Sequence, residues 1–313
     1  MEEDEEAYND YDDIFGGERE REEAEAGISA RDIEARMRKE KERGGMGGFG
    51  EDKLDEEAIN AYYRNRYNED AIAQIRSLSP DLIIVVAYGL LLPKDLLDIP
   101  QYGCLNLHPS LLPKYLGPTP VVTSFKNGDT STGISLMLLD PGMDTGPVIS
   151  QEALEINNTD TAETLTHRLF ERGADLLIRS IAPWAERTLK PHKQDDSQAT
   201  ITMKITREDG LADWSLQPIV LDRYRRAFTP WPGLYSHWDG KLIKFLETSY
   251  DTSIRSTNPP GSVLKLSSSN QGIGVVSGNG ILELNTLQLE GKSAISGADF
   301  LKGYPSIEHA ILK

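Results

Sequence analysis

Hydrophobic and polar positions divide the chain into stretches with different periodicities. Residues 82–87 read Leu-Ile-Ile-Val-Val-Ala, a continuous apolar run bounded by Pro80 and Gly89. A short run of this kind predicts a strand buried on both faces. A second apolar stretch predicts a strand over residues 133–140, followed by another over 147–154.

Helical spacing appears between and after these strands. Helices are predicted over residues 54–78, 93–97, 119–127 and 161–189. The last is long and amphipathic, and we expect it to cover the sheet with one apolar face. That face consists of Leu165, Leu169, Leu176, Leu177 and Ile181.

The pattern changes beyond residue 205. A helix is predicted to begin near Asp213, followed by five short strands over residues 234–238, 242–248, 261–266, 272–276 and 281–289. Asp239-Gly240 and the Gly-Asn-Gly at 278–280 are hairpin turn signals. Short strands joined by tight turns favour a small barrel such as an OB-fold.

The first 53 residues differ from the rest in charge. Residues 1–50 hold 17 acidic and 8 basic residues, a net charge of −9 out of −17 for the whole chain. Glu and Arg recur there at helical spacing without an apolar stripe, and 44–50 is rich in glycine. We therefore expect an acidic arm that is largely disordered or a solvated helix.

Three polar residues follow the predicted strands. Asn106 and His108 are two residues apart, so in an extended segment both side chains point the same way. Asp144 lies in a glycine-rich turn after the second strand. An Asn amide can donate to a developing oxyanion, a His can donate or move a proton near neutral pH, and an Asp can orient the His. Each alone is typical of a turn, surface or core position, but together they favour acyl-transfer chemistry.

The motifs around these residues resemble a known family. Asn-Leu-His-Pro-Ser-Leu-Leu-Pro at 106–113, followed by Asp-Pro-Gly-Met-Asp-Thr-Gly at 140–146, is similar to the folate-dependent formyltransferases. Within that family, Val-Ala-Tyr-Gly at 86–89 and Arg-Ala-Phe-Thr-Pro-Trp-Pro-Gly at 226–233 resemble the methionyl-tRNA formyltransferases. The resemblance runs from about Glu69 to the C-terminus.

The resemblance implies an α/β fold with three parts. Residues 1–53 are the acidic arm, 54–205 a truncated, Rossmann-like formyltransferase domain, and 206–313 an OB-like barrel domain. It implies transfer of a formyl group from 10-formyltetrahydrofolate, a co-substrate, to methionyl initiator tRNA in translation initiation. Asn106 and His108 would hold the oxyanion, while Asp144 would pair with His108 and help the amine lose its proton.

The resemblance also implies a folate pocket. Its expected lining residues are Val86, Ala87, Tyr88, Gly89, Leu90, Ser110, Leu111, Leu112, Pro113, Asp140 and Gly142. We expect the Leu112–Pro113 bond to be cis. A basic edge facing the tRNA is expected from Arg223, Arg225, Arg226, Lys241 and Lys244, although solvated surface charges fit these residues equally well. We expect Trp231 to anchor the junction between the domains.

The chain departs from the family in two places. The relatives have about three strand–helix units before the equivalent of Leu82, and residues 1–53 contain no apolar strand. Leu116 stands where the family usually has Arg. A missing half-sheet would leave one edge of the strand at 82–87 open, so we expect the chain to self-associate through that edge.

Two other functions stay open. The chain could be a catalytically impaired binding or scaffold protein, or an aberrant fusion product, whose acidic arm docks a partner. Alternatively, it is another folate-dependent formyltransferase that acts on a small amine, such as a nucleotide precursor or an amino sugar. The segment at 226–233 favours the tRNA enzyme.

Composition limits the compartment and the metal chemistry. Cys104 is the one cysteine, which indicates a reducing compartment and a small buried side chain. The sequence has no run of 18 apolar residues and no signal peptide, so we expect a cytoplasmic protein without a membrane span. The other histidines do not cluster, and we predict no metal.

Overall fold

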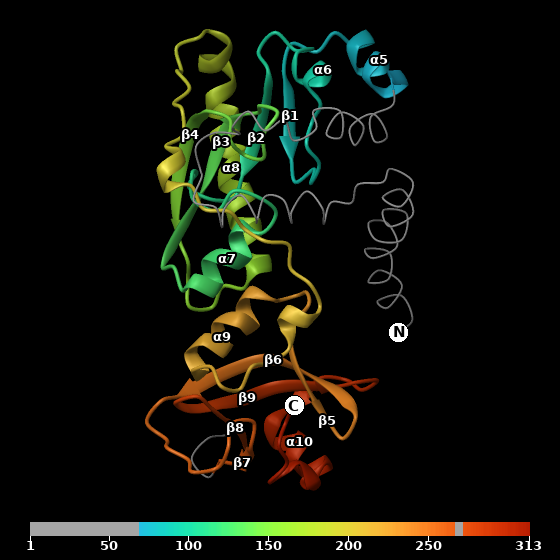
Figure 1. The fold of residues 1–313 in the computed structure, drawn as a ribbon, viewed down its shortest axis with the longest axis vertical. Coiled ribbons are helices and arrows are strands. Elements are labelled where there is room, and N and C mark those ends of the chain that lie inside the picture. Colours follow the sequence, from blue (N-terminus) through green and yellow to red (C-terminus); the bar gives the residue numbers. More distant parts are fainter. Residues whose placement is uncertain (1–68, 267–271) are drawn as a thin grey trace, which may run out of the picture.

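A computed structural model describes residues 69–266 and 272–313, which form two sheets placed one beyond the other along the long axis (Figure 1). The predicted acidic arm and most of the predicted helix at 54–78 lie outside these residues. The end of that helix is α5 (Glu69–Ser77).

The first sheet has the strand order β1 (Ile83–Val86), β2 (Cys104–His108), β3 (Ser131–Leu138) and β4 (Val148–Glu155). β1 and β2 are parallel and are connected through α6 (Lys94–Leu97). The remaining pairs are antiparallel, with α7 (Pro120–Asn127) between β2 and β3. The predicted α/β class is confirmed. Strand β3 begins and ends two residues earlier than the predicted strand at 133–140.

The predicted burial of the first strand is wrong for one face. Ile84 and Val86 are 37% and 45% exposed, whereas Ile83 and Val85 pack around Cys104. Within the described residues β1 pairs with β2 alone. A continuous apolar run cannot distinguish a central strand from one at an edge, because the run itself carries no information about neighbours.

Helix α8 (Ala162–Ala185) covers the first sheet. It begins with a capping box between Thr161 and Thr164, and Leu165 and Leu169 are fully buried. Gly173 allows close contact, since a Cβ there would lie 3.1–3.2 Å from side-chain atoms of Ile134 and Leu107.

The inward stripe of α8 continues through Leu176 to Ser180 rather than to Ile181. Ile181 is 38% exposed, so its predicted place on the buried face is wrong. It lies about 100° around the helix from Ser180, which is itself four residues beyond Leu176. The helix ends four residues before the predicted Leu189.

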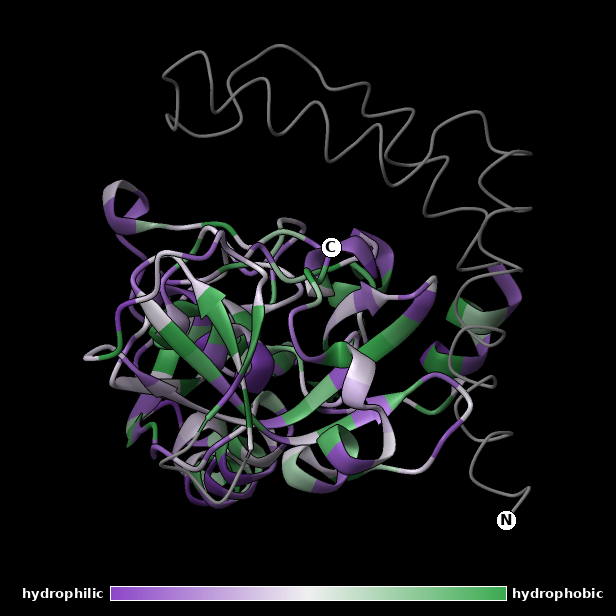
Figure 2. Ribbon diagram, turned by 90° about the horizontal axis from the view of Figure 1, so that it is seen from below, coloured by the Kyte–Doolittle hydropathy of each residue, from purple (hydrophilic) through white to green (hydrophobic). Residues whose placement is uncertain are grey.

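The second domain consists of an antiparallel sheet with helices at its margins. Its strands are β5 (Leu234–Trp238), β6 (Lys241–Asp251), β7 (Val263–Lys265), β8 (Ile273–Ser277), β9 (Gly280–Leu289) and β10 (Ile295–Ser296). The order is β5-β6-β9-β8-β7, with β10 on β9. All five predicted strands are present, and their apolar residues form most of the second core. Figure 2 shows hydrophobic positions along the strands. Helix α10 (Gly297–Gly303) and the 3-10 turn η4 (Pro305–Ile307) follow.

Helix α9 (Pro218–Ala227) joins the two domains. Leu221 belongs to the core of the second sheet, Ala227 and Phe228 belong to the core of the first, and Tyr224 contacts both. The predicted start near Asp213 is wrong, because the Asp213 carboxylate accepts from Ser215 in a turn and Pro218 begins the helix.

The predicted role of Trp231 at the junction is also wrong. Its side chain is 41% exposed, and Phe228, three residues earlier, is the buried aromatic residue there. Between residues 186 and 217 the chain passes from α8 to α9 through η2 (Asp196–Gln198) and η3 (Glu208–Gly210). Within residues 69–266 and 272–313, no helix combines the length and apolarity needed to cross a membrane.

The environment of Cys104 leads to a first prediction. The residue is 1% exposed, and burial raises the pKa of its thiol to about 11. At pH 8 only on the order of one thiol in a thousand is then ionised, and the thiolate is the reactive form. We expect Ellman's reagent to leave the folded chain unreacted and to titrate one thiol in denaturant. Ser197→Cys, at an exposed position, should add one fast-reacting thiol. Rapid labelling of the folded parent chain would contradict this burial.

Candidate active site

The carboxyl ends of β1 and β2 lie side by side because the two strands are parallel, with Val86 opposite Leu107. This edge of an open α/β sheet is where ligand sites form. Ala87 and Gly89 follow β1 in left-handed conformations, with φ of 50° and 73°. Asn106 and His108 are on β2, and no hydrogen bond joins the Asn106 side chain to another described residue. Its amide is therefore free to donate to a ligand.

His108 is buried between a backbone carbonyl and a carboxylate. Its Nε2 lies 2.8 Å from the carbonyl oxygen of Tyr115, and its Nδ1 lies 3.5 Å from Oδ2 of Asp144. A carbonyl oxygen can only accept, so Nε2 carries a hydrogen. The structure thus brings His108 and Asp144 together as predicted. The 3.5 Å separation is longer than a good hydrogen bond and leaves Nδ1 weakly held.

Asp144 is positioned by the loop between β3 and β4. The loop starts where Leu139 N–H donates to the carbonyl of Cys104, the first residue of β2. It then brings Asp144 to His108, the last residue of β2. Asp144 has a φ of 57°, and its Oδ2 accepts a 2.8 Å hydrogen bond from Gly117 N–H. Its side chain is 16% exposed. The left-handed backbone aims the carboxylate inward, at a cost of roughly 1 kcal/mol.

Tyr115 is a site residue that the sequence did not reveal. It is 4% exposed with a φ of 65°, and its carbonyl holds the His108 ring. Its hydroxyl donates to Asp129 at 2.6 Å and accepts from Asn127 at 2.9 Å. Burial and the bond to Asp129 raise the pKa of the phenol. These anchors hold the strained backbone in place, and the only sequence signal was an aromatic residue two positions before Gly117.

The turn at 110–113 is held by hydrogen bonds to Lys114, Ser135 and Gln151. The Leu112–Pro113 bond is cis, as expected. The Ser110 hydroxyl donates to Lys114 O, and the Ser110 carbonyl accepts from the Ser135 hydroxyl. Gln151 donates to Leu112 O and to Ser135. Ser135 and Gln151 were not singled out in the sequence, where they look like ordinary strand residues.

The predicted folate-lining residues divide into two groups. Val86 and Tyr88 are 45% and 48% exposed at the end of β1 and face outward. Ser110 and Leu112 are 0% and 5% exposed and belong to the protein interior. The Asp140 carboxylate accepts from Gly142 N–H and from the Thr145 hydroxyl, which shapes the loop at 140–146. A ligand at this edge would meet the first group and the loop, whereas Ser110 and Leu112 support them from behind.

The predicted basic residues do not form one exposed edge. Arg225 and Arg226 have side chains 13% and 14% exposed, and both pair with Asp222 at 3.4 and 3.2 Å. Burial lowers the pKa of the Arg225 guanidinium, and Asp222 opposes that effect. The Arg223 guanidinium packs against Gly128 at the end of α7. Lys241, in contrast, is exposed. The burial of Arg225 and Arg226 favours a structural role at the junction.

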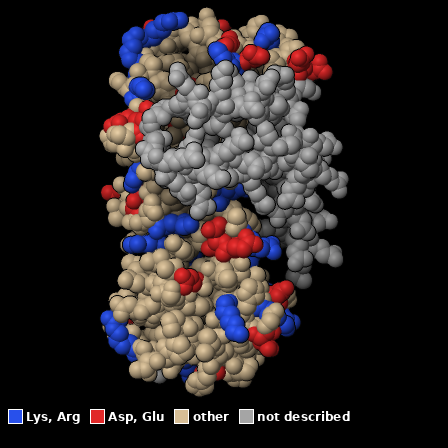
Figure 3. Space-filling model, in the orientation of Figure 1, with Lys and Arg blue, Asp and Glu red and all other residues tan. Residues whose placement is uncertain are grey.

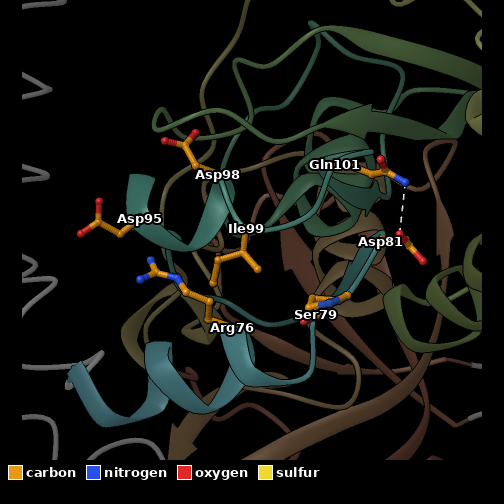
Figure 4. A pocket seen from close by; sticks show the side chains of 8 residues that line it. Arg76, Ser79, Asp81, Asp95, Asp98, Ile99 and Gln101 are labelled. Atoms are coloured by element: carbon orange, nitrogen blue, oxygen red, sulfur yellow. Dashed lines mark hydrogen bonds between the residues drawn. The ribbon is translucent and has the colours of Figure 1, made fainter.

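A hollow of about 550 Å³ lies away from this site, between α5, α6 and the turn before β1 (Figure 4). Its lining includes Arg76, Asp95, Asp98 and an Asp81–Gln101 hydrogen bond of 3.1 Å. None of the predicted site residues borders it. Within the described ranges no three His, Cys, Asp or Glu side chains gather as metal ligands would.

Comparisons with known proteins identify the family of this site. The formyl transferase model matches residues 19–181, and the model of the formyl transferase C-terminal domain matches residues 204–305. The chain belongs to the formyl transferase family. The first match extends further towards the N-terminus than the motifs did, into residues outside the described ranges.

Relatives in this family have a consistent name. The methionyl-tRNA formyltransferase of Chloroflexus aurantiacus is 41% identical over 232 residues, 74% of this chain and 74% of the relative. That of Roseiflexus castenholzii is 38% identical over 233 residues, again 74% of each.

Solved structures support the formyl transferase fold. HypX from Aquifex aeolicus, determined in complex with tetrahydrofolic acid, has a TM-score of 0.58 at 18% identity, over 75% of this chain and 41% of that one. The sugar 3N-formyl transferase WlaRD has a TM-score of 0.52 at 17% identity, over 70% of this chain and 77% of that one. At these identities the likeness concerns the fold alone.

The packing of Gly146 leads to a second prediction. A Cβ at Gly146 would lie 1.9 Å from the carbonyl oxygen of Leu138, in backbone that cannot move without opening the β3–β4 ladder. We expect Gly146→Ala to displace the Asp144 loop and to destabilise the chain by about 2 kcal/mol or more. Thermal unfolding and turnover would measure this. Gly303→Ala is the control, since nothing lies within 4 Å of its Cβ. Equal behaviour of the two variants would contradict the predicted clash.

Proposed function

We propose that this chain transfers a formyl group from 10-formyltetrahydrofolate to the α-amine of methionyl initiator tRNA. The observation that carries the proposal is that Asp144 reaches the buried His108 on the strand that also presents Asn106, at the carboxyl edge of the sheet. Relatives at about 40% identity over three quarters of their length bear the name of this activity. The amine attacks the electrophilic formyl carbon, and the tetrahedral intermediate collapses by breaking the bond to the folate nitrogen, which takes up a proton as it leaves.

The roles of the three residues follow from their surroundings. Asn106 has an uncommitted amide, so it donates a hydrogen bond to the oxygen on which charge develops. His108 is fixed by Tyr115 at Nε2 and presents a weakly held Nδ1 beside Asp144, where a proton can move. Asp144 orients the ring and receives the proton from the amine through water. Because tight packing already holds these side chains in place, they need little reorganisation during the reaction.

The end of β1 and the Asp144 loop are suited to hold the folate. Val86 and Tyr88 offer exposed apolar and aromatic surface, and a Cβ at Gly89 would meet nothing within 4 Å. The loop at 140–146 contributes backbone groups on the side of Asp144. Apolar surface with a few polar groups at its margin is typical of small-molecule sites.

The tRNA would approach along the junction of the two domains. On the face shown in Figure 3, Lys and Arg side chains gather at the level where the domains meet, beside a patch of carboxylates. Lys241 and Lys244 lie on β6 of the second sheet. With a net charge of −17, the chain needs such a local basic surface to bind RNA.

Several expectations remain predictions. These are self-association through the edge of β1, a cytoplasmic location, the absence of a metal and the division at residues 53 and 205. The scaffold function and transfer to a small amine would be favoured only if purified chain failed to formylate methionyl-tRNA. A formylation assay with 10-formyltetrahydrofolate, offering initiator methionyl-tRNA and amino-sugar nucleotides separately, distinguishes all three.

A third prediction concerns the catalytic residues. Asn106→Ala, His108→Ala and Asp144→Ala should each raise the barrier by about 2–4 kcal/mol, the range for losing an oxyanion contact. Single-turnover rates would measure this, and the effects should not add, because the three residues act as a unit. His167→Ala, at an exposed site on α8, should be neutral. Near-native turnover in any of the three variants removes that residue from the mechanism.

A fourth prediction concerns RNA. Lys241→Glu with Lys244→Glu should weaken tRNA binding and lower the slope of log affinity against log salt by roughly two, one for each lost phosphate contact. Lys265→Glu, exposed on β7, is the matched control and should leave the slope unchanged. Filter binding between low and moderate salt measures both. A slope that is the same in the double variant and in the control would remove β6 from the RNA surface.

A further inference from the structure

The connection between α8 and α9 includes a segment, residues 190–204, that we call the linker. Its residues are exposed or half-buried apart from two, Gln194 and Thr202, which are 8% and 4% exposed. Both are polar, and both direct their side chains into the first domain. Buried polar side chains in an otherwise exposed segment need hydrogen-bond partners, and those partners show what the linker does.

Gln194 holds the loop that carries Asp144. Its Nε2 donates to the carbonyl oxygen of Asp144 at 2.6 Å and to that of Gly146 at 2.8 Å. The two accepting residues flank Thr145, and the first of them, Asp144, has a left-handed backbone conformation. Backbone hydrogen bonds between His192 and Val148 fix the linker two residues before Gln194.

The other half of the Gln194 amide indicates that the contact is not incidental. Its Oε1 is buried and has no hydrogen-bond partner within the described residues. Leaving a buried acceptor unpaired is unfavourable, and a Met would fill the same space without that cost. The two hydrogen bonds from Nε2 to the Asp144 loop offset the unfavourable burial of Oε1.

Thr200 and Thr202 hold the second loop, residues 113–119. All five N–H groups of this loop donate hydrogen bonds, and three of them donate to the linker. Tyr115 N–H donates to the Thr200 hydroxyl, Leu116 N–H to the Thr200 carbonyl, and Thr119 N–H to the Thr202 hydroxyl. The Thr202 hydroxyl donates in turn to Leu116 O.

The two loops meet at the catalytic pair. The 113–119 loop supplies the Tyr115 carbonyl to His108 and the Gly117 N–H to Asp144. The 140–146 loop supplies Asp144 itself. The linker therefore contacts the support of each member of the pair, while lying outside the pair.

We propose that Gln194 and Thr202 are positioning residues for formyl transfer, and that the linker is a working part of the active site rather than a connection between domains. This inference rests on the proposed function, because it assigns the residues to that reaction.

The test uses isosteric variants of the full chain. Gln194→Met removes both bonds to the Asp144 loop, and Thr202→Val removes the hydroxyl contacts of the other loop. Gln198→Met and Thr206→Val are the controls, because these residues are exposed in the same connection and bond only to nearby carboxylates.

Hydrogen exchange provides a readout that needs no turnover. We expect the Gly117 amide to exchange about tenfold faster in Gln194→Met, although Gln194 does not touch residue 117, because freeing the Asp144 backbone releases its carboxylate. Thr202→Val should accelerate the Thr119 amide by a similar factor. Controls should match the parent. Unchanged Gly117 exchange in Gln194→Met would overturn the role of Gln194, and unchanged Thr119 exchange in Thr202→Val that of Thr202.

Kinetics then separate positioning from simple stability. The kcat of Gln194→Met per folded molecule should fall by about tenfold to a hundredfold, with the KM for methionyl-tRNA within twofold of the parent, as expected for misplacement of a reacting group. Loss of stability with unchanged kcat would overturn the proposal. If the parent chain itself does not formylate methionyl-tRNA, the proposed function fails, whereas the exchange results still decide whether the linker holds the two loops.

Discussion

The contact on which the site depends is the hydrogen bond from His108 Nε2 to the Tyr115 carbonyl. It fixes which ring nitrogen carries hydrogen and turns the other towards Asp144. The carbonyl points inward only because Tyr115 is left-handed, and the hydroxyl of the same residue is held by Asp129 and Asn127. A strained backbone angle, a phenol and a carboxylate at the surface end of α7 thus determine the chemistry of one imidazole.

A similar dependence applies to Asp144. Its backbone is left-handed, its carboxylate accepts from Gly117, and its carbonyl accepts from Gln194. The site therefore includes two short loops that are joined directly by the hydrogen bond from Gly117 N–H to the Asp144 carboxylate. The first sheet contributes Asn106 and His108. The long helix α8 covers the other face of that sheet and does not contact these residues.

Much of this arrangement was readable from the sequence. The alternation of β2 placed Asn106 and His108 on one side, the glycine-rich turn placed Asp144, and short strands with tight turns gave the second sheet. The remainder was not readable for physical reasons. The exposure of Ile84 and Val86 could not be predicted, because burial depends on neighbouring strands that a local apolar run does not specify. Tyr115, Gln151, Gln194 and Thr202 act through bonds to distant backbone, which leave no periodic signal. Arg225 and Arg226 look like surface charges until Asp222, on the same helix, is placed beside them.

Helix α9 has a consequence for how the molecule unfolds. Leu221 is part of one hydrophobic core and Ala227 part of the other, only six residues apart on a single helix. Neither domain can lose this helix without opening its own interior, so the two should melt in one cooperative transition rather than in sequence. The same sharing makes exchange of the second domain between relatives difficult, because a foreign domain would bring a helix whose last turn must also complete the interior of the first.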